Sequence, residues 1–163
     1  MLVQHLSDCL AVIEPLQREC GMGAFRLLDV GSGGGLPGIV IAAVLPQVEV
    51  TCIDSVGKKA AFVRQVAGEL KLRNLRSVHS RVEDFEASAF DVVSSRAFAS
   101  LADFVRLTSP LLATNGTWMA MKGKTPDAEI AELPGDISVF HVEQLRVPHL
   151  AAERCIVWMR PLR

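Results

Sequence analysis

The apolar positions of this chain change their spacing several times between its two ends. Short, mostly apolar runs end at Gly, Asp or Ser, which is typical of buried β-strands. Such runs predict strands at residues 25–30, 48–53, 75–79, 90–95, 117–122, 138–145 and 155–159. The segments between them repeat apolar residues every three or four positions, which is the spacing of a helix with one buried face. Helices are expected at residues 1–16, 37–45, 58–72, 100–112 and 125–129.

Local signals refine these elements. Ser100 and Asp103 form a capping-box pattern at the start of one helix. Pro110 is expected to bend that helix, and Asn115-Gly116 to turn the chain into the next strand. The helix at 58–72 is expected to bury one face and expose its charges. Its buried face would consist of Phe62, Val63, Val66, Ala67 and Leu70.

The order of the elements predicts the fold class. Strand and helix alternate five times, which indicates an α/β Rossmann-like fold with a mostly parallel seven-stranded sheet and helices on both faces. No repeat or linker interrupts the pattern, so residues 1–163 are expected to form a single domain. Ligands of such sheets bind beyond the carboxyl ends of the strands.

Composition excludes several classes of protein. Half of the residues are hydrophobic and 21% are charged, which is an ordinary globular balance. The longest apolar run, residues 36–45, is too short to cross a bilayer, and Asp8 and Glu14 interrupt any signal peptide. The four cysteines form no CxxC pair, so no metal site is expected and the thiols should be reduced. A cytoplasmic location is the expectation.

Charge is distributed unevenly although the net charge is only −1. Between residues 58 and 81 basic side chains dominate, opposed only by Glu69. They are Lys58, Lys59, Arg64, Lys71, Arg73, Arg76 and Arg81. A stripe of this density is either a phosphate-binding surface or a solvated helix face followed by an exposed loop.

A glycine-rich loop, residues 31–38, follows the first strand and leads into a helix. Gly33, Gly35 and Gly38 fit the dinucleotide pattern GxGxxG, but counted from Gly31 the third glycine position holds Leu36. The carboxylate of Asp29 would repel a pyrophosphate and attract an ammonium group. The loop therefore favours S-adenosylmethionine over a nicotinamide dinucleotide. The expected cofactor contacts here are Asp29, Gly31, Ser32, Gly33 and Leu36.

Two further segments fit an adenosyl group. Asp54 and Ser55 end the second strand, where a carboxylate can accept hydrogen bonds from ribose hydroxyls, or alternatively cap the next helix. Val82 and Glu83 follow the third strand, where their backbone groups can bond the edge of the purine.

The stretch after the fourth strand, residues 94–98, lies where methyltransferases of this fold meet their substrate. It has no Asn-Pro-Pro-aromatic sequence and no cysteine nucleophile. Guanine N7 needs neither, because its lone pair is free at neutral pH and no general base is required. Phe98 is either a stacking platform or a core residue, and Arg96 calls for an anionic or dipolar partner.

Together these segments resemble the RsmG (GidB) family of methyltransferases, which modify guanine N7 in bacterial small-subunit rRNA. The matching stretches are residues 28–38, 54–59, 80–85, 95–101 and 121–123. The resemblance implies the class I methyltransferase fold, S-adenosylmethionine as cofactor, and 16S rRNA or the small ribosomal subunit as partner. A monomer without a metal is expected. The resemblance places cofactor contacts on Gly31, Leu36, Val82, Glu83 and Arg96, and suggests Lys58, Lys59, Phe98 and Lys122 for RNA.

One departure accompanies the resemblance. Family members carry further helices before the point that corresponds to Met1, including an Asn-Leu-Thr stretch, so the chain is expected to be a shortened form. Three other functions remain open from the residues alone. They are a nicotinamide-dependent oxidoreductase, a methyltransferase of small molecules, and an RNA-binding remnant without activity.

Overall fold

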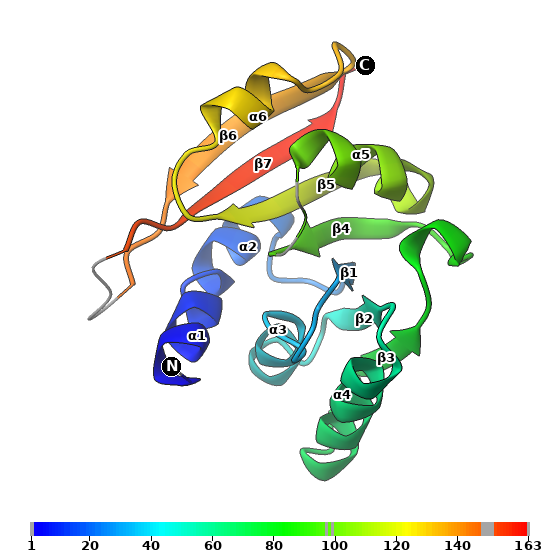
Figure 1. Cartoon of the computed structure of the whole chain (residues 1–163). Helices are drawn as coiled ribbons and strands as arrows, with labels where there is room; N and C mark the ends of the chain where they lie inside the picture. The colour runs from blue at the N-terminus through cyan, green and yellow to red at the C-terminus, as the bar shows by residue number, and fades with distance from the viewer. Residues whose placement is uncertain (1, 97, 99, 148–151, 163) are drawn as a thin grey trace.

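A computed structural model describes residues 2–96, 98, 100–147 and 152–162, and its centre is a seven-stranded sheet (Figure 1). The strands follow the spatial order β3-β2-β1-β4-β5-β7-β6. Neighbours from β3 to β5 pair in parallel, whereas β7 is antiparallel to both β5 and β6. The strands are β1 (Arg26–Val30), β2 (Glu49–Asp54), β3 (Leu75–His79), β4 (Phe90–Ser95), β5 (Leu112–Lys122), β6 (Ile137–Gln144) and β7 (Cys155–Pro161). The predicted fold class is confirmed.

The direction of strand addition reverses between β1 and β4. From β1 the chain adds β2 and β3 on one side, then crosses to place β4 and β5 on the other. Such a reversal leaves a crevice at the carboxyl ends of the two central strands, where open α/β sheets bind ligands. Asp29 of β1 lies beside Ser94 of β4 at this point.

Helices cover both faces of the sheet, as Figure 1 shows. The helices are α1 (Leu2–Leu10), α2 (Ile13–Cys20), α3 (Gly38–Val44), α4 (Gly57–Glu69), α5 (Leu101–Thr108) and α6 (Asp127–Ala131), with short 3₁₀ turns η1 (Val82–Asp84) and η2 (Ser109–Leu111). Helices α1 to α4 lie on one side, and α5 and α6 on the other. In the described part of the chain no helix has the length and apolar character that a membrane span requires.

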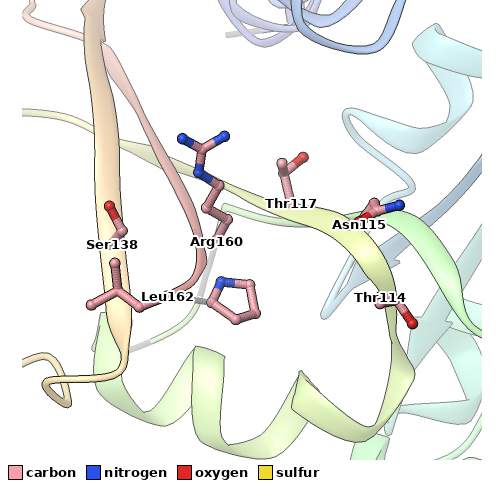
Figure 2. A pocket seen from close by; sticks show the side chains of 8 residues that line it. Thr114, Asn115, Thr117, Ser138, Arg160 and Leu162 are labelled. Carbon is pink, nitrogen blue, oxygen red and sulfur yellow. The ribbon is translucent and has the colours of Figure 1, made fainter.

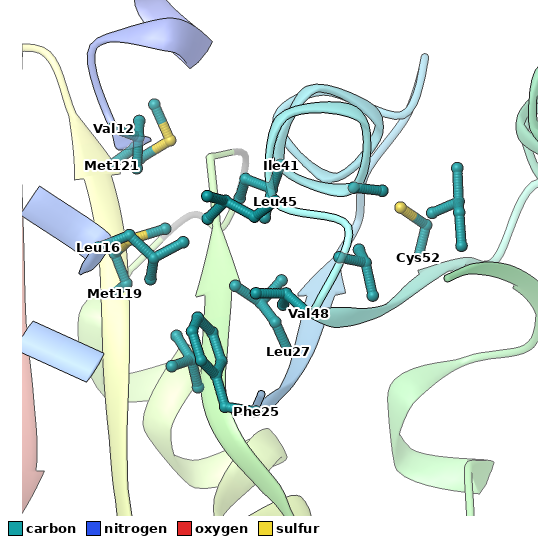
Figure 3. Close-up of a cluster of buried hydrophobic side chains, with 14 of the residues drawn as sticks. Val12, Leu16, Phe25, Leu27, Ile41, Leu45, Val48, Cys52, Met119 and Met121 are labelled. Carbon is teal, nitrogen blue, oxygen red and sulfur yellow. The ribbon is translucent and has the colours of Figure 1, made fainter. Parts of the chain in front are cut away.

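Alternate residues of each central strand supply the two halves of the core. Leu27 faces α2 and α3, together with Ile41 and Met119 (Figure 3). Its neighbour Leu28 faces α5 on the opposite side, with Phe104. Both faces are therefore buried, which explains why these strands read as continuous apolar runs rather than as alternating ones.

The single helix expected at residues 1–16 is wrong, because the chain breaks into α1 and α2 around Ala11 and Val12. Pro15 provides the physical reason, since it has no N–H to donate to the carbonyl of Ala11. The Val12 N–H instead bonds back to Cys9 at 3.2 Å. A proline is tolerated in the first turn of a new helix, so α2 starts there.

The turn expected at Asn115-Gly116 is also wrong, since both residues lie inside β5. The pairing of β4 with β5 is irregular at this point: Phe90 faces Leu112, but Val92 already faces Thr117. The extra residues form a bulge that Gly116 accommodates, because a Cβ there would lie 2.8 Å from Leu112. By contrast, Ser100 caps α5 as predicted, accepting a hydrogen bond from the Asp103 N–H at 3.1 Å.

The apolar face expected for the helix at 58–72 is partly wrong. Ala60 and Val63 of α4 are buried against the sheet, as the helical spacing requires. Phe62 and Leu70 are instead 50% and 57% exposed. Phe62 lies within α4 and Leu70 directly follows it, so the helix presents an aromatic ring to solvent near Lys58 and Lys59.

Candidate cofactor site

The glycine loop crosses the carboxyl ends of β1 and β2. Gly31 and Gly33 have φ of 64° and 57°, in the left-handed region that residues with a Cβ rarely adopt. The Gly31 N–H donates to the carbonyl of Ile53 at 2.9 Å, which ties the loop to the end of β2. A Cβ on Gly31 would meet nothing within 4 Å, so this face of the loop is open.

Asp54, the last residue of β2, is hydrogen-bonded to the glycine loop. One carboxylate oxygen, Oδ2, accepts from the Gly33 N–H at 2.9 Å, and Oδ1 accepts from the Val56 N–H at 2.8 Å. The side chain is 8% exposed and lines the pocket described below. Each oxygen has a second lone pair, so both can still accept a hydrogen bond from a ribose hydroxyl.

Asp29 lies beneath the loop and is fully buried. Oδ2 accepts from the Gly38 N–H at 3.0 Å, and Oδ1 accepts from the Ser94 hydroxyl at 3.2 Å. Burial raises the pKa of Asp29 to about 7, against these two hydrogen bonds and the charge of Arg96, which lower it. The carboxyl group joins β1, β4 and α3, and its direct contact with a cofactor ammonium stays a prediction.

A pocket of about 520 Å³ opens above these groups, at the carboxyl edge of the sheet. Among its walls are Gly31, Asp54, Ser55, Val82 and Glu83, all predicted for the cofactor, and Lys59 and Phe98, both suggested for RNA. The structure thus brings together residues from four separate segments of the chain. The volume is within the range of small-molecule sites, roughly 300–1,000 Å³.

The two predicted adenine contacts open the 3₁₀ turn η1. The N–H groups in the first turn of such a helix have no partner within the helix. Val82 is buried and contributes an apolar side chain to the wall of the pocket, whereas Glu83 is exposed. The contact of these two residues with a purine stays a prediction.

Sequence reasoning missed several members of the pocket wall. Val30, Ile53, Val56, Ser80 and Arg81 also line it. Four of them are immediate neighbours of a predicted residue, and Ser80 lies two positions before Val82, so extending every motif by two positions would have found them all. Three predicted residues of the loop are not in the wall: Ser32 is buried, Gly33 bonds Asp54, and Leu36 is half-buried.

Arg96, just past the end of β4, is turned toward α1 rather than into the pocket. One terminal guanidinium nitrogen lies 3.2 Å from His5 Nδ1 and 3.9 Å from an Asp8 carboxylate oxygen. The other donates to the Cys9 sulfur at 3.8 Å. The anionic partner expected for Arg96 is thus a side chain of the protein itself, and its contact with the cofactor stays a prediction.

The side chains suggested for RNA occupy different settings. Lys58 and Lys59 are exposed in the first turn of α4. Phe98 is half-buried and packs against Phe104, with ring centroids 5.4 Å apart. Lys122 donates to Glu129 at 2.9 Å and to the Phe98 carbonyl at 3.3 Å. Glu129 also accepts from the Leu101 N–H at 3.1 Å, so this network braces the segment after β4.

A second hollow, of about 480 Å³, lies at the opposite edge of the sheet (Figure 2). It is lined by Asn115 and Thr117 near the start of β5 and by Arg160 near the end of β7. The carboxyl ends of the parallel strands point away from this hollow, and none of the predicted cofactor residues reaches it. The pocket at Asp54 is therefore the candidate site.

The cysteines offer no activated nucleophile. Burial raises the pKa of the Cys9 thiol to about 11 and that of Cys20 to about 12, and it also raises the pKa values of Cys52 and Cys155. Thiols in this state stay protonated and unreactive at neutral pH. In the residues that the structure describes, no cluster of His, Cys, Asp and Glu has the arrangement of a metal site.

Comparison with known proteins identifies the family of the chain. Residues 1–157 match the GidB family, described as rRNA small subunit methyltransferase G. The chain belongs to the rRNA small subunit methyltransferase G family. Ribosomal RNA small subunit methyltransferase G of Leptothrix cholodnii is 62% identical over 99% of the chain and 74% of its own length. The protein of the same name from Methylibium petroleiphilum is 59% identical over 98% and 72%.

Solved structures share the fold of this methyltransferase G chain at much lower identity. TrmN from Thermus thermophilus superposes with a TM-score of 0.74 at 18% identity, covering 93% of the chain and 48% of TrmN. The mitomycin 7-O-methyltransferase MmcR gives a TM-score of 0.75 at 13% identity, covering 98% and 54%. The class I methyltransferase fold is thereby confirmed.

Proposed function

We propose that the chain transfers a methyl group from S-adenosylmethionine to N7 of a guanine in 16S rRNA. The family supports the reaction class and the ribosomal substrate. The lining of the pocket supports the cofactor. The nitrogen atom is supported by the stretch after β4, which has no Asn-Pro-Pro-aromatic sequence and no cysteine nucleophile. A substrate within the ribosome also fits the cytoplasmic location expected from the sequence.

The decisive observation is the hydrogen bond from the Gly33 N–H to Asp54. In a dinucleotide site the backbone N–H groups of the glycine loop receive a pyrophosphate. Here the Gly33 N–H is bonded to a carboxylate, and the charge of that carboxylate would repel phosphate oxygens. An adenosyl group without phosphates avoids this conflict, and its ribose hydroxyls suit Asp54.

The residues of the pocket fit the parts of such a cofactor. Asp54 can receive the ribose, and the first turn of η1 can receive the purine. The open face of Gly31 leaves room for the ligand where a side chain would otherwise stand. When bound, S-adenosylmethionine supplies an electrophilic methyl group, which the N7 lone pair takes while the carbon–sulfur bond breaks.

The chain has to orient the target base and does not have to move a proton. N7 loses no proton on methylation, so no general base is required. The rate then depends on holding the base in line with the methyl group. The half-buried ring of Phe98 lines the pocket and packs against Phe104 of the core, so it is a surface on which the target base can stack.

The RNA is expected to approach across α4. Lys59 is exposed and lines the pocket, and Lys58 is exposed next to it. Phe62 lies on the same side of the helix one turn further along. Basic side chains bind phosphates through charge and counterion release, and an exposed ring adds stacking. This combination favours RNA over the alternative that α4 is only a solvated face.

Gly31→Val tests the cofactor site. The branched side chain would project into the pocket, and we expect the affinity for S-adenosylhomocysteine, measured by calorimetry, to fall at least tenfold. Gly21→Val is the matched control, because Gly21 also has a positive φ, 81°, with open space around its Cβ but lies outside the pocket. Equal affinities for the wild type and Gly31→Val would show that the site is elsewhere.

The substrate is tested separately. Small ribosomal subunits from cells that lack this protein are incubated with labelled S-adenosylmethionine, and the 16S rRNA is digested for mass analysis. We expect the label in 7-methylguanosine. Label at another atom would refute the N7 assignment, and label only in small molecules would refute the RNA substrate.

A further inference from the structure

Asp8 on α1 is a buried carboxylate without an assigned role, and its side chain is 4% exposed. Its Oδ2 accepts from the Arg154 side chain at 3.2 Å and lies 3.9 Å from a nitrogen of Arg96. Its other oxygen, Oδ1, is buried and has no hydrogen-bond partner among the described residues. One carboxylate therefore joins α1 to the ends of two strands, β4 through Arg96 and β7 through Arg154.

Helix α1 fixes Arg96 through more than this ion pair. His5, one turn before Asp8, lies 3.2 Å from the same guanidinium nitrogen, and Cys9 accepts from the other at 3.8 Å. Arg96 is thus held on one side by three residues of a single helix. Its side chain remains 25% exposed, so N–H donors on the other side stay accessible.

Stability alone does not account for this arrangement. Removing a carboxylate from water is costly, and an apolar side chain of similar volume usually stabilises a buried position at least as well. A buried ion pair instead fixes a direction, because the planar guanidinium can meet a carboxylate in only a few orientations. The side chain that is oriented here follows β4 directly, at the ligand-binding edge of the sheet.

We infer that Asp8 is a positioning residue that holds Arg96 ready for the carboxylate of the amino-acid end of the cofactor. The inference rests on the proposed function, because it requires a cofactor with such a carboxylate. It assigns α1 to the active site, although no residue of α1 lines the pocket. Arg96 would pair with the ligand through its free N–H donors while Asp8 and His5 keep the guanidinium in place.

The test measures binding of S-adenosylhomocysteine by calorimetry to four proteins. Asp8→Asn keeps the size of the side chain but removes its charge, and Arg96→Gln removes the guanidinium. We expect each to raise Kd about tenfold, and the double variant to raise it no further. A purely structural role for Asp8 would weaken binding equally in both backgrounds, so a loss in the double variant equal to the product of the single losses overturns the inference.

Glu143→Gln is the matched control. Glu143 is a carboxylate with 18% exposure that likewise has two partners, in its case Arg18 and His141, but it lies on β6 and outside the pocket. Its Kd should equal that of the wild type. If Asp8→Asn does not fold by circular dichroism, His5→Ala replaces it, since His5 is exposed and its loss removes only an acceptor of Arg96.

The outcomes separate the two proposals. His5→Ala should raise Kd about threefold, and an unchanged Kd for either α1 variant, with binding by the wild type intact, overturns this inference alone. A folded wild type that binds no S-adenosylhomocysteine overturns the proposed function, and the inference with it.

Discussion

Asp29 couples the ionisation of one buried group to the stability of the whole loop. Its carboxyl group is held by Gly38 and Ser94, and burial raises its pKa from 3.8 to about 7. The folded state therefore binds this proton more tightly than the unfolded state does. Folding loses stability as the pH rises between these two values, and the penalty is complete above the folded pKa.

Asp29→Asn should remove this pH dependence. The amide can still accept from the Gly38 N–H through its oxygen and donate to the Ser94 hydroxyl, so the fold is retained. Urea denaturation at pH 5 and pH 8 measures the free energy of unfolding. The wild type should lose stability between these pH values relative to the variant, whereas parallel losses would contradict the assigned ionisation.

Asp103→Asn serves as the control. Asp103 is exposed and its pKa is lowered, chiefly by the hydrogen bond from Arg106 and also by that from Ser100. A lowered pKa contributes stability that is lost only as the pH falls toward it. Asp103 is therefore ionised throughout pH 5–8, and its replacement should leave the pH profile unchanged.

The residues of the site differ in how far the sequence could predict them. The position of Asp54 was predictable, because in this fold the carboxyl end of the second strand lies beside the glycine loop. The direction of Arg96 was not, since it depends on His5, Asp8 and Cys9 of a helix far away in the chain. The spacing of apolar residues in the sequence predicts where the backbone runs, but the partner of a long side chain depends on tertiary packing.

Helix α4 joins the pocket to the surface expected to meet RNA. Replacing Lys58 and Lys59 together by Gln should weaken RNA binding most strongly at low salt, because each lost phosphate contact lowers the salt dependence. We expect the slope of log Kd against log salt to fall by about 1.5 in magnitude, measured by filter binding to 16S rRNA fragments. Kd for S-adenosylhomocysteine should change little.

Phe62→Ala separates stacking from charge on the same helix. The ring is half exposed, so its loss should leave the fold intact. We expect RNA affinity to fall about tenfold with an unchanged salt slope, since stacking releases no counterions. Met22→Ala, at a residue that is 72% exposed in the segment between α2 and β1, is the control for the loss of an exposed apolar side chain. Equal RNA binding by Phe62→Ala and the wild type would remove α4 from the interface.

The elements themselves were predicted unevenly. The strands at 75–79 and 90–95 agree with β3 and β4, because each is a short apolar run between clear breaks. The turn at Asn115-Gly116 failed because pairing with β4 continues through a bulge, which propensity cannot foresee. Phe62 and Leu70 were misplaced because the apolar side chains of α4 outnumber those that the sheet can cover.

At the scale of the whole molecule, the site is assembled at the carboxyl ends of neighbouring parallel strands. Gly31 follows β1, Asp54 ends β2, and Val82 follows β3, so three consecutive strands each contribute one wall. These residues lie far apart in the sequence and meet only in the folded sheet. A ligand that touches all three therefore binds the folded chain and not the unfolded one.

Such a ligand must raise the thermal stability by mass action. At a concentration about 100 times its Kd, S-adenosylhomocysteine should add about 2.7 kcal/mol to the free energy of unfolding. For a domain of 163 residues this corresponds to a rise in Tm of about 5–11 °C. Scanning calorimetry with increasing ligand measures it. NADH at the same concentrations should produce no shift, because the Gly33 N–H that its pyrophosphate would need is bonded to Asp54. A rise with NADH and none with S-adenosylhomocysteine would reverse the choice of cofactor.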